Sequence, residues 1–424
     1  MRILGLFFSF ISFYSCGQIQ VVQLEKPKGA TYAHAQVEPS IFINPKDTSK
    51  IIAGSVLDDY YYSIDGGRTW TSRTMHSPSG VYGDPCMLID TAENYYYFHL
   101  SEGKGGSWLD KMICQKATEI DGKFNGGTFS PPDGKIHDKE WAVVNPKNNE
   151  IYMTWTIFDK YNSKNPEDSS FIYFSKSTDA AETWSQPIRI SKHGGDCRDG
   201  DQTAEGAVPA VGPNGEIYVS WSRNDTLWFN KSLDGGETWM EEETFVSLHV
   251  GGWDMKIEGI NRCNGMPVTH CDLSDSPHQG RIYVNFADKR NGEDNSDIFL
   301  VYSDDGGQTW SEVIKVNQDK SKKEQFLTWM CIDQSNGDLY FVYYDRRKTK
   351  DKYTDVYAAR SDDGGATFSE VKLTEKPFKP NGFIFFGDYS NISAHKGMIR
   401  PIFNRMDDMK ISLWTAILYD YHFK

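Results

Sequence analysis

The chain has 424 residues, 14% of them aromatic, and a formal net charge of −14 at pH 7. This excess of negative charge argues against nucleic acid as a partner, because phosphate binding needs a basic surface. Helical periodicity is nearly absent, and the aromatic content favours stacked β-sheets. The length would allow two domains, but one repeated pattern runs from about residue 38 to the end and favours a single domain.

The N-terminus begins with Met1-Arg2 and an apolar stretch to Phe13, which is typical of a secretory signal peptide. Residues 13–17 read Phe-Tyr-Ser-Cys-Gly and resemble a bacterial lipoprotein cleavage site, with Cys16 as the lipidated residue. We therefore expect residues 1–16 to be a lipoprotein signal, residues 17–424 to be one domain, and the protein to be anchored at the outer membrane. The alternative is an ordinary signal and a periplasmic or secreted protein. No later stretch is apolar enough to span a bilayer.

An eight-residue phrase recurs five times, with a serine, an aspartate, two small residues and a closing Thr-Trp or Thr-Phe. Its aspartates are Asp65, Asp179, Asp234, Asp305 and Asp363, and a degenerate sixth copy lies at 118–129. The phrase is typical of a tight turn, in which glycine supplies a positive φ and the Asp and Ser side chains accept backbone hydrogen bonds. Its regular recurrence indicates a repeat architecture.

A second repeat alternates apolar and aromatic residues, as in 151–155, and occurs seven times. A short apolar strand, such as 141–144, precedes each copy. With the strand after each turn, every unit contains four strands. Seven such units predict an all-β, seven-bladed β-propeller of antiparallel blades, with six blades as the alternative. The last unit lacks the phrase, and residues 19–25 are a candidate strand that closes the ring.

The recurring phrase resembles the Asp-box of sialidases and related β-propellers, the BNR-repeat superfamily. The resemblance implies that the boxes are structural, because in this superfamily they lie away from the active site. It also implies a site with three arginines, a tyrosine nucleophile and a glutamate. The family's opening Arg-Ile-Pro motif is not matched before the first inner strand, where Ala, Gln and Val separate His34 from Glu38. The seven blades and a histidine-bearing rim are reminiscent of the propeller-type ulvan lyases.

We expect the functional site at the end of the propeller opposite the boxes, where the inner strands begin and the loops between second and third strands gather. The candidate catalytic residues are His137, His34, Tyr389, Glu38 and Asp84. The candidate substrate-binding residues are Arg223, Arg290, Arg346, Arg405, Lys139, Trp108 and Trp253. Arginine has a planar fork that matches carboxylate or sulfate, and tryptophan offers a stacking surface for a sugar ring.

These residues predict an exported carbohydrate-active enzyme that degrades an acidic, uronic-acid-containing polysaccharide by elimination, as a lyase or dehydratase. Elimination requires an arginine-held carboxylate and a positioned base, for which His137, His34 and Tyr389 are candidates. One alternative is a sialidase-like hydrolase or a glycosidase that uses two carboxylates, with Glu205 and Asp388 among the candidates. Another is a non-catalytic carbohydrate-binding surface protein.

We expect the protein to be a monomer whose partner is an acidic oligosaccharide or polysaccharide. The sequence requires no cofactor. Ca²⁺ is conceivable at a carboxylate-rich rim, but no ligand loop of recognisable spacing is present. Apart from Cys16 the chain has six cysteines, an even number that an exported protein could pair, and their spacing fits no zinc site.

Overall fold

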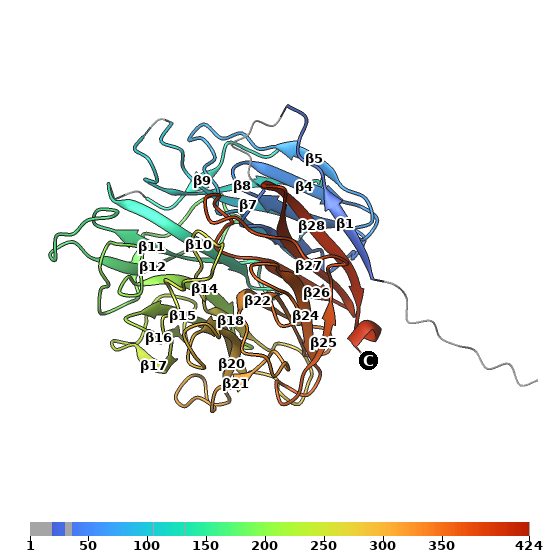
Figure 1. The fold of residues 1–424 in the computed structure, drawn as a ribbon. Coiled ribbons are helices and arrows are strands. Elements are labelled where there is room, and N and C mark those ends of the chain that lie inside the picture. The colour runs from blue at the N-terminus through green and yellow to red at the C-terminus, as the bar shows by residue number, and fades with distance from the viewer. Residues whose placement is uncertain (1–18, 30–35, 105, 132, 424) are drawn as a thin grey trace, which may run out of the picture.

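The structure is a computed structural model that describes residues 19–29, 36–104, 106–131 and 133–423. Seven four-stranded antiparallel sheets are arranged as blades around a central channel (Figure 1). The predicted seven-bladed propeller is thereby confirmed, and the six-bladed alternative is wrong. The expected signal, Cys16 and His34 lie outside the described residues.

Each blade runs from an inner strand at the channel to an outer strand at the circumference. Blades 1 to 3 contain β2 (Ser40–Ile43), β3 (Ile51–Ser55), β4 (Asp59–Ser63) and β5 (Thr71–Thr74); β6 (Cys86–Ile89), β7 (Tyr95–Leu100), β8 (Met112–Ala117) and β9 (Thr128–Phe129); and β10 (Ile136–Val144), β11 (Ile151–Phe158), β12 (Ser170–Ser177) and β13 (Ile188–Arg189). Blades 4 and 5 contain β14 (Glu205–Val211), β15 (Ile217–Arg223), β16 (Thr226–Ser232) and β17 (Thr244–Leu248); and β18 (Val268–Cys271), β19 (Ile282–Asp288), β20 (Asp297–Ser303) and β21 (Ile314–Lys315). Blade 6 contains β22 (Gln325–Asp333), β23 (Asp338–Asp345), β24 (Asp355–Ser361) and β25 (Ser369–Lys372).

Blade 7 closes the ring with strands from both ends of the chain. It contains β26 (Asn391–His395), β27 (Met398–Asp407) and β28 (Lys410–Tyr419), and its outer strand is β1 (Gln20–Leu24). β1 pairs antiparallel with β28, from Gln20 opposite Ile417 to Leu24 opposite Leu413. The closing strand predicted at 19–25 is confirmed.

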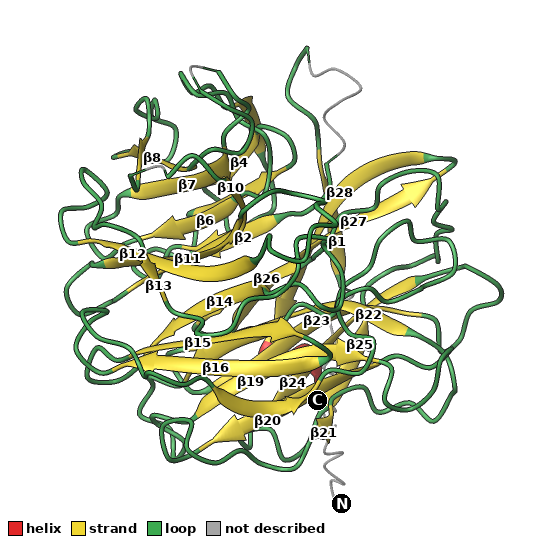
Figure 2. Ribbon diagram, turned by 90° about the vertical axis from the view of Figure 1, so that its left-hand side faces the viewer, coloured by secondary structure: helices red, strands yellow, loops and turns green. Residues whose placement is uncertain are grey.

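Strands and loops make up nearly all of the described chain (Figure 2). The only helical element among the described residues is the 3-10 turn η1 (Asp420–Phe423), and none of their helices has the length and apolar character of a membrane span. All six cysteines in the described part are buried and free, so the disulfide pairing that their even number suggested is wrong.

The boxes are structural turns that also bind one blade to the previous one. In the fourth full copy, Asp305 accepts hydrogen bonds from the backbone N–H and hydroxyl of Thr309, at 2.9 and 2.6 Å. These bonds lower the pKa of Asp305 to about 2. Gly307 has a φ of +81°, and a Cβ there would lie 2.3 Å from the ring of Phe229 in blade 4. Glycine is therefore required by both the turn and the packing.

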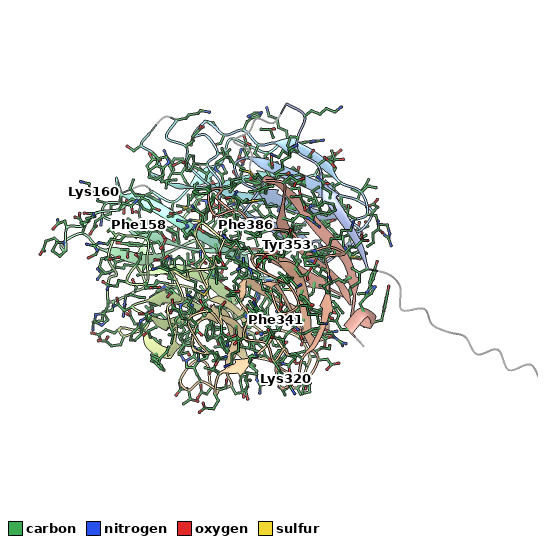
Figure 3. All side chains as sticks on the ribbon, in the orientation of Figure 1. Phe158, Lys160, Lys320, Phe341, Tyr353 and Phe386 are labelled. Carbon is green, nitrogen blue, oxygen red and sulfur yellow. The ribbon has the colours of Figure 1, made fainter. Side chains whose placement is uncertain are left out.

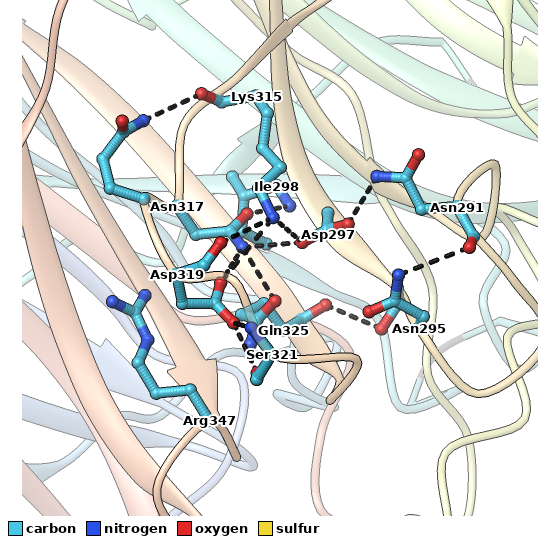
Figure 4. A network of polar contacts seen from close by, with 12 residues as sticks. Asn291, Asn295, Asp297, Ile298, Lys315, Asn317, Asp319, Ser321, Gln325 and Arg347 are labelled. Atoms are coloured by element: carbon cyan, nitrogen blue, oxygen red, sulfur yellow. Dashed lines mark hydrogen bonds and ion pairs between the residues drawn. The ribbon is translucent and has the colours of Figure 1, made fainter.

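Polar side chains also link neighbouring blades. Between blades 5 and 6, the Asn317 amide donates to Asp297 at 2.6 Å and to Gln325 at 2.8 Å (Figure 4). Because Asp297 begins β20 and Gln325 begins β22, this amide holds the start of an inner strand against the preceding blade. Buried polar groups that are satisfied in this way rigidify a fold.

Aromatic rings close the central channel partway along its length. Trp141 of blade 3 and Trp329 of blade 6 meet across it with ring centroids 4.3 Å apart, and Tyr389 packs edge-on to Trp141 at 5.7 Å. Toward the ends of the inner strands lies a largely apolar cavity of about 450 Å³. Toward their starts lies a cluster of charged side chains, which is the candidate site.

Candidate functional site

A cluster of buried charged groups occupies the mouth of the channel, where the inner strands begin. We call it the pore-mouth cluster and define it by Glu38, Asp84, Asp138, Lys139, Glu140, Asp199, Glu205, Arg262, Asp388 and Tyr389. Most of its side chains are at least nine-tenths buried. So many carboxyl groups out of water are costly unless they are paired or protonated, which makes the arrangement a functional-site candidate.

The backbone at the strand starts aims these side chains at the channel. Six of the seven blades have a residue with a positive φ just before the regular part of the inner strand: Glu38, Asp84, Lys139, Gly206, Leu327 and Gly387, with φ between +48° and +86°. In blade 3 the ladder shifts register between Asp138 and Trp141, as expected of a β-bulge. Bulges re-aim side chains, and positive φ at residues other than glycine stores strain that is common at functional sites.

Lys139 is the cation at the base of the cluster. Its Nζ lies 2.5 Å from Asp388, 3.5 Å from Asp84 and 3.8 Å from Glu38. Burial opposes the charge of Lys139, but these three carboxylates raise its pKa well above the usual value. The ammonium therefore stays charged and joins acids from blades 1, 2 and 7.

Arg262 forms the roof of the cluster and comes from the long connection between β17 and β18. Its Nε donates to Asp388 at 2.8 Å, and its Nη1 donates to Asp199 at 2.5 Å. About a third of the side chain, 31%, is exposed, so the cluster reaches solvent beside it.

The pKa values of six of the carboxyl groups shift, some downward and some upward. Burial opposes ionisation of Asp388, but Lys139 and Arg262 lower its pKa. Asp199 is likewise lowered: burial raises its pKa, and Arg262 outweighs that effect together with weaker partners. Burial raises the pKa of Asp138 to about 7, against 3.8 ordinarily.

Three glutamates of the cluster also have raised pKa values. Burial and then Asp84 raise the pKa of Glu38 and of Glu140 well above the usual value. Burial and then Asp199 do the same for Glu205. The mouth thus holds carboxyl groups with lowered pKa values beside carboxyl groups with raised ones, which is the division that acid–base catalysis requires.

An aromatic edge adjoins the acids at the surface. Tyr161 donates its hydroxyl to Asp199 at 2.7 Å and packs edge-on to Trp108 with centroids 5.9 Å apart. Trp108 is 40% exposed and also contacts Tyr82, which is 38% exposed. Trp253 differs, because it is buried and donates its indole N–H to Asp199 at 3.3 Å. Of the two predicted tryptophans, only Trp108 presents a ring to solvent.

The structure places the candidate catalytic residues in two environments. Glu38, Asp84 and Tyr389 belong to the pore-mouth cluster, and the Tyr389 hydroxyl has no hydrogen-bond partner among the described residues. Burial, followed by Asp84 and Glu38, raises its pKa well above the usual value. His137 is buried away from this cluster, with its Nε2 3.0 Å from Asp133 and its ring stacked on Trp155.

The four predicted arginines are each engaged within or beside their own blade. Arg223 pairs with Glu243 and lies over Trp228, and Arg290 pairs with Asp288 at 2.6 Å. Arg405 pairs with Asp407 at 2.6 Å. Arg346 donates to the Glu258 carbonyl at 2.8 Å and lies 3.6 Å from Glu324. Of the predicted cations, only Lys139 joins the acids of the pore mouth.

Asp138, Glu140, Asp199 and Arg262 complete the site; the repeats place Asp138, Glu140 and Arg262 on this rim without a catalytic or binding role, and Asp199 was not predicted. Asp138 and Glu140 flank Lys139, whose φ is +54°. No sequence pattern shows this backbone angle, which sets the direction of the neighbouring side chains. Asp199 and Arg262 come from long connections without a strand pattern, where nothing in the sequence shows which side chain turns inward. Among the described residues, no group of three or more His, Cys, Asp or Glu side chains is arranged to hold a metal ion.

The chain belongs to the family of the BNR repeat-like domain, whose model matches residues 156–386, more than half of the chain. It is 30% identical over 175 residues to a xyloglucanase of Acetivibrio thermocellus, a match that covers 40% of this chain and 19% of the relative. The chain thus matches about a fifth of the length of this curated relative.

Two solved structures share the fold at low sequence identity. An ulvan lyase from a new family of polysaccharide lyases has a TM-score of 0.54 at 15% identity, covering 92% of this chain and 95% of the lyase. The NanB sialidase from Streptococcus pneumoniae has a TM-score of 0.50 at 8% identity, covering 88% and 84%. At these identities the likeness shows the architecture alone.

Proposed function

We propose that this protein is a carbohydrate-active enzyme that cleaves a glycan bound across the pore mouth. The observation that carries the proposal is a cluster of buried carboxyl groups, with lowered and raised pKa values, whose Asp199 is joined through Tyr161 to the exposed ring of Trp108. Sugar rings stack on aromatic side chains, and glycoside cleavage uses an acid and a carboxylate. The similarity to a xyloglucanase supports the same class of substrate.

Asp138 and Asp199 are the pair that we assign to the chemistry. Burial raises the pKa of Asp138, Lys139 opposes that shift, and Asp84 and Asp199 add to it. Asp138, with a pKa near 7, is the general acid that protonates the leaving oxygen. Asp199 is held ionised by Arg262 and oriented by Tyr161, so it acts as the carboxylate that serves as base or nucleophile.

Hydrolysis fits the site better than the elimination that the sequence favoured. Elimination next to a uronate requires free cations to neutralise its carboxylate. The predicted arginines are engaged elsewhere, and in the pore-mouth cluster Lys139 and Arg262 face seven carboxyl groups. A second negative group would be repelled there, so we propose a neutral glycan as the substrate at the mouth. Elimination on a uronate stays a prediction with Tyr389 as its best-placed base.

We further propose that the protein acts outside the cytoplasm, exported by the segment 1–16 and anchored through a lipid on Cys16. The motif at 13–17 supports this proposal. Metabolic labelling with a radiolabelled fatty acid tests it: label in the wild-type protein and none in Cys16→Ser would support the anchor. Equal labelling of both, or of neither, would contradict it.

The product of glycan cleavage tests the proposed reaction. The protein is incubated with xyloglucan and other neutral glucans, with pectin, ulvan, alginate and glycosaminoglycans, and with sialyl-lactose. New reducing ends from a neutral glycan, without the ultraviolet absorbance of an unsaturated uronate, are expected. That absorbance would support a lyase or dehydratase instead, and no product from any glycan would favour a binding protein.

A further inference from the structure

A second cavity lies on blade 6, and its residues take no part in the pore-mouth cluster. We call it the blade-6 groove. It has a volume of about 690 Å³ and is lined by Lys348, Thr349, Lys350, Tyr353, Asp355, Tyr357, Glu370, Lys372 and Pro377. Its walls are β24, β25 and the connections that precede and follow them. The volume is within the range of roughly 300–1,000 Å³ typical of small-ligand sites.

The acids of the groove are neutralised from within the blade. Glu370 accepts hydrogen bonds from Arg347 at 2.7 and 2.6 Å, and also one from the Tyr343 hydroxyl. Asp355 accepts the Thr374 hydroxyl at 2.7 Å and lies 3.4 Å from Lys372. Neither carboxylate is left to repel an anion.

Two lysines of the groove face solvent without an acidic partner. Lys348 and Lys350 are exposed, and no carboxylate of the described chain lies within ion-pair distance of either. In a protein with a net charge of −14, such a site is a local exception. Its field attracts anions that the rest of the surface repels.

Aromatic rings provide the apolar part of the groove. Tyr353, labelled in Figure 3, is 41% exposed, and Lys379 lies over its ring at 5.3 Å. Tyr357 is fixed between Tyr343, which stacks on it at 6.4 Å, and Arg347, which lies over it at 4.4 Å. The partly exposed Tyr353 ring, with Lys379 over one face, beside the ammonium groups of Lys348 and Lys350 matches a sugar that carries an anionic substituent.

We propose that the blade-6 groove binds an acidic sugar unit of a polysaccharide, one that carries a carboxylate or sulfate group. Lys348 and Lys350 contact the anionic group, and Tyr353 stacks on the ring. The inference goes beyond the reaction proposed at the pore mouth, since this site holds a glycan without cleaving it. Single-stranded nucleic acid is disfavoured, because it needs a series of stacking rings along a basic path, and the groove exposes one.

The test is direct binding by the full chain to four probes: an oligogalacturonide, a sulfated glycosaminoglycan oligosaccharide, a xyloglucan oligosaccharide and a single-stranded DNA oligonucleotide. Titration calorimetry at low salt gives the Kd of each. We expect binding of at least one acidic oligosaccharide, weakened at least tenfold in the Lys348→Glu/Lys350→Glu variant. Tyr353→Ala should weaken it several-fold. The carboxylate and sulfate probes distinguish the two anionic groups.

The matched control is Lys123→Glu/Lys164→Glu, which changes the net charge equally at two exposed lysines outside the groove. Unchanged binding in the control supports the proposal. An equal loss of affinity in both variants would show that net charge alone accounts for binding, and it would overturn the proposal. Absence of binding to both acidic oligosaccharides, or tighter binding of DNA, would overturn it. Turnover at the pore mouth should be the same in both variants, so failure of this site is separable from failure of the proposed enzyme.

Discussion

The aspartates of the boxes and those of the pore mouth are the same chemical group in opposite circumstances. Asp305 lies in an exposed turn whose hydrogen bonds lower its pKa to about 2. Asp138 lies among other acids, and burial raises its pKa to about 7. The box carboxylate is ionised at neutral pH, and the hydrogen bonds that it accepts stabilise the turn. It therefore serves the fold. The mouth carboxyl changes its charge near neutral pH, so it can serve a reaction.

The difference predicts unequal costs of removing a carboxylate. Asp388→Ala leaves two cations at the mouth with one partner fewer, and breaking such a buried pair costs about 3–5 kcal/mol of unfolding free energy. Asp305→Ala removes an exposed turn carboxylate that accepts four hydrogen bonds, which costs about 1–2 kcal/mol. Denaturant unfolding of both variants measures the two values. Equal losses of unfolding free energy would contradict the difference between a buried, ion-paired carboxylate at the mouth and an exposed carboxylate in a box turn.

Two tryptophans sharpen the comparison between structural and functional groups: Trp253 donates to Asp199, and Trp108 packs on Tyr161. Trp253→Ala empties a buried site and should lower the unfolding free energy by about 3–5 kcal/mol. Trp108→Ala removes an exposed ring, so we expect near-normal stability and a KM raised roughly 2–10-fold, as for the loss of one aromatic contact. Thermal unfolding and steady-state kinetics give both readouts. An unchanged KM in Trp108→Ala would contradict the role of Trp108 as a stacking surface for a sugar ring.

The dependence of stability on pH separates Asp138 from the box aspartates. The native state binds the Asp138 proton more tightly than the unfolded state, whose pKa is near 3.8. Ionisation of Asp138 therefore destabilises the fold progressively as the pH rises from about 4 through 7. Asp138→Asn should raise the Tm at pH 8, by on the order of 2 °C or more, and leave it nearly unchanged at pH 4. A lower Tm at pH 8 would show that the ionised carboxylate is stabilised.

The smallest effect is expected for an arginine outside the pore-mouth cluster. Arg405 pairs with Asp407, whose side chain is half exposed, and lies over the rings of Phe378 and Trp414, so Arg405→Ala should cost less than about 1 kcal/mol of unfolding free energy. The corresponding change in kcat/KM on a neutral glycan is less than about twofold. A loss of a hundredfold or more would return this arginine to the role of substrate ligand that its sequence position suggested.

The sequence predicted the architecture because each blade repeats the same local chemistry. The box turns, the alternating strands and the closing strand at 19–25 all recur or fall at the expected place, and the structure confirms them. Glu38, Asp84, Lys139 and Tyr389 were placed at the mouth by the same repeats. Local patterns suffice for such features, because they depend on neighbours along the chain.

The rest of the site could not be predicted, because it depends on contacts between distant segments. Asp388 meets Arg262 across 126 residues and Lys139 across 249. The sequence shows that Arg290 is near Asp288, but it does not show whether the arginine pairs with that acid or turns toward a ligand. The raised pKa of Asp138 arises first from burial and then from Asp84 and Asp199, which come from other parts of the chain and have no local signal.

The pH dependence of kcat/KM in the wild-type protein and in Asp138→Asn tests the central claim most directly. The account predicts wild-type cleavage of a neutral glycan that declines as the pH rises through about 7, where Asp138 loses its proton. Asp138→Asn should be folded and slower by roughly 10²–10⁴-fold, the usual contribution of a general acid. Wild-type kinetics in Asp138→Asn, with the same decline above pH 7, would contradict the assignment of the pore mouth as the active site.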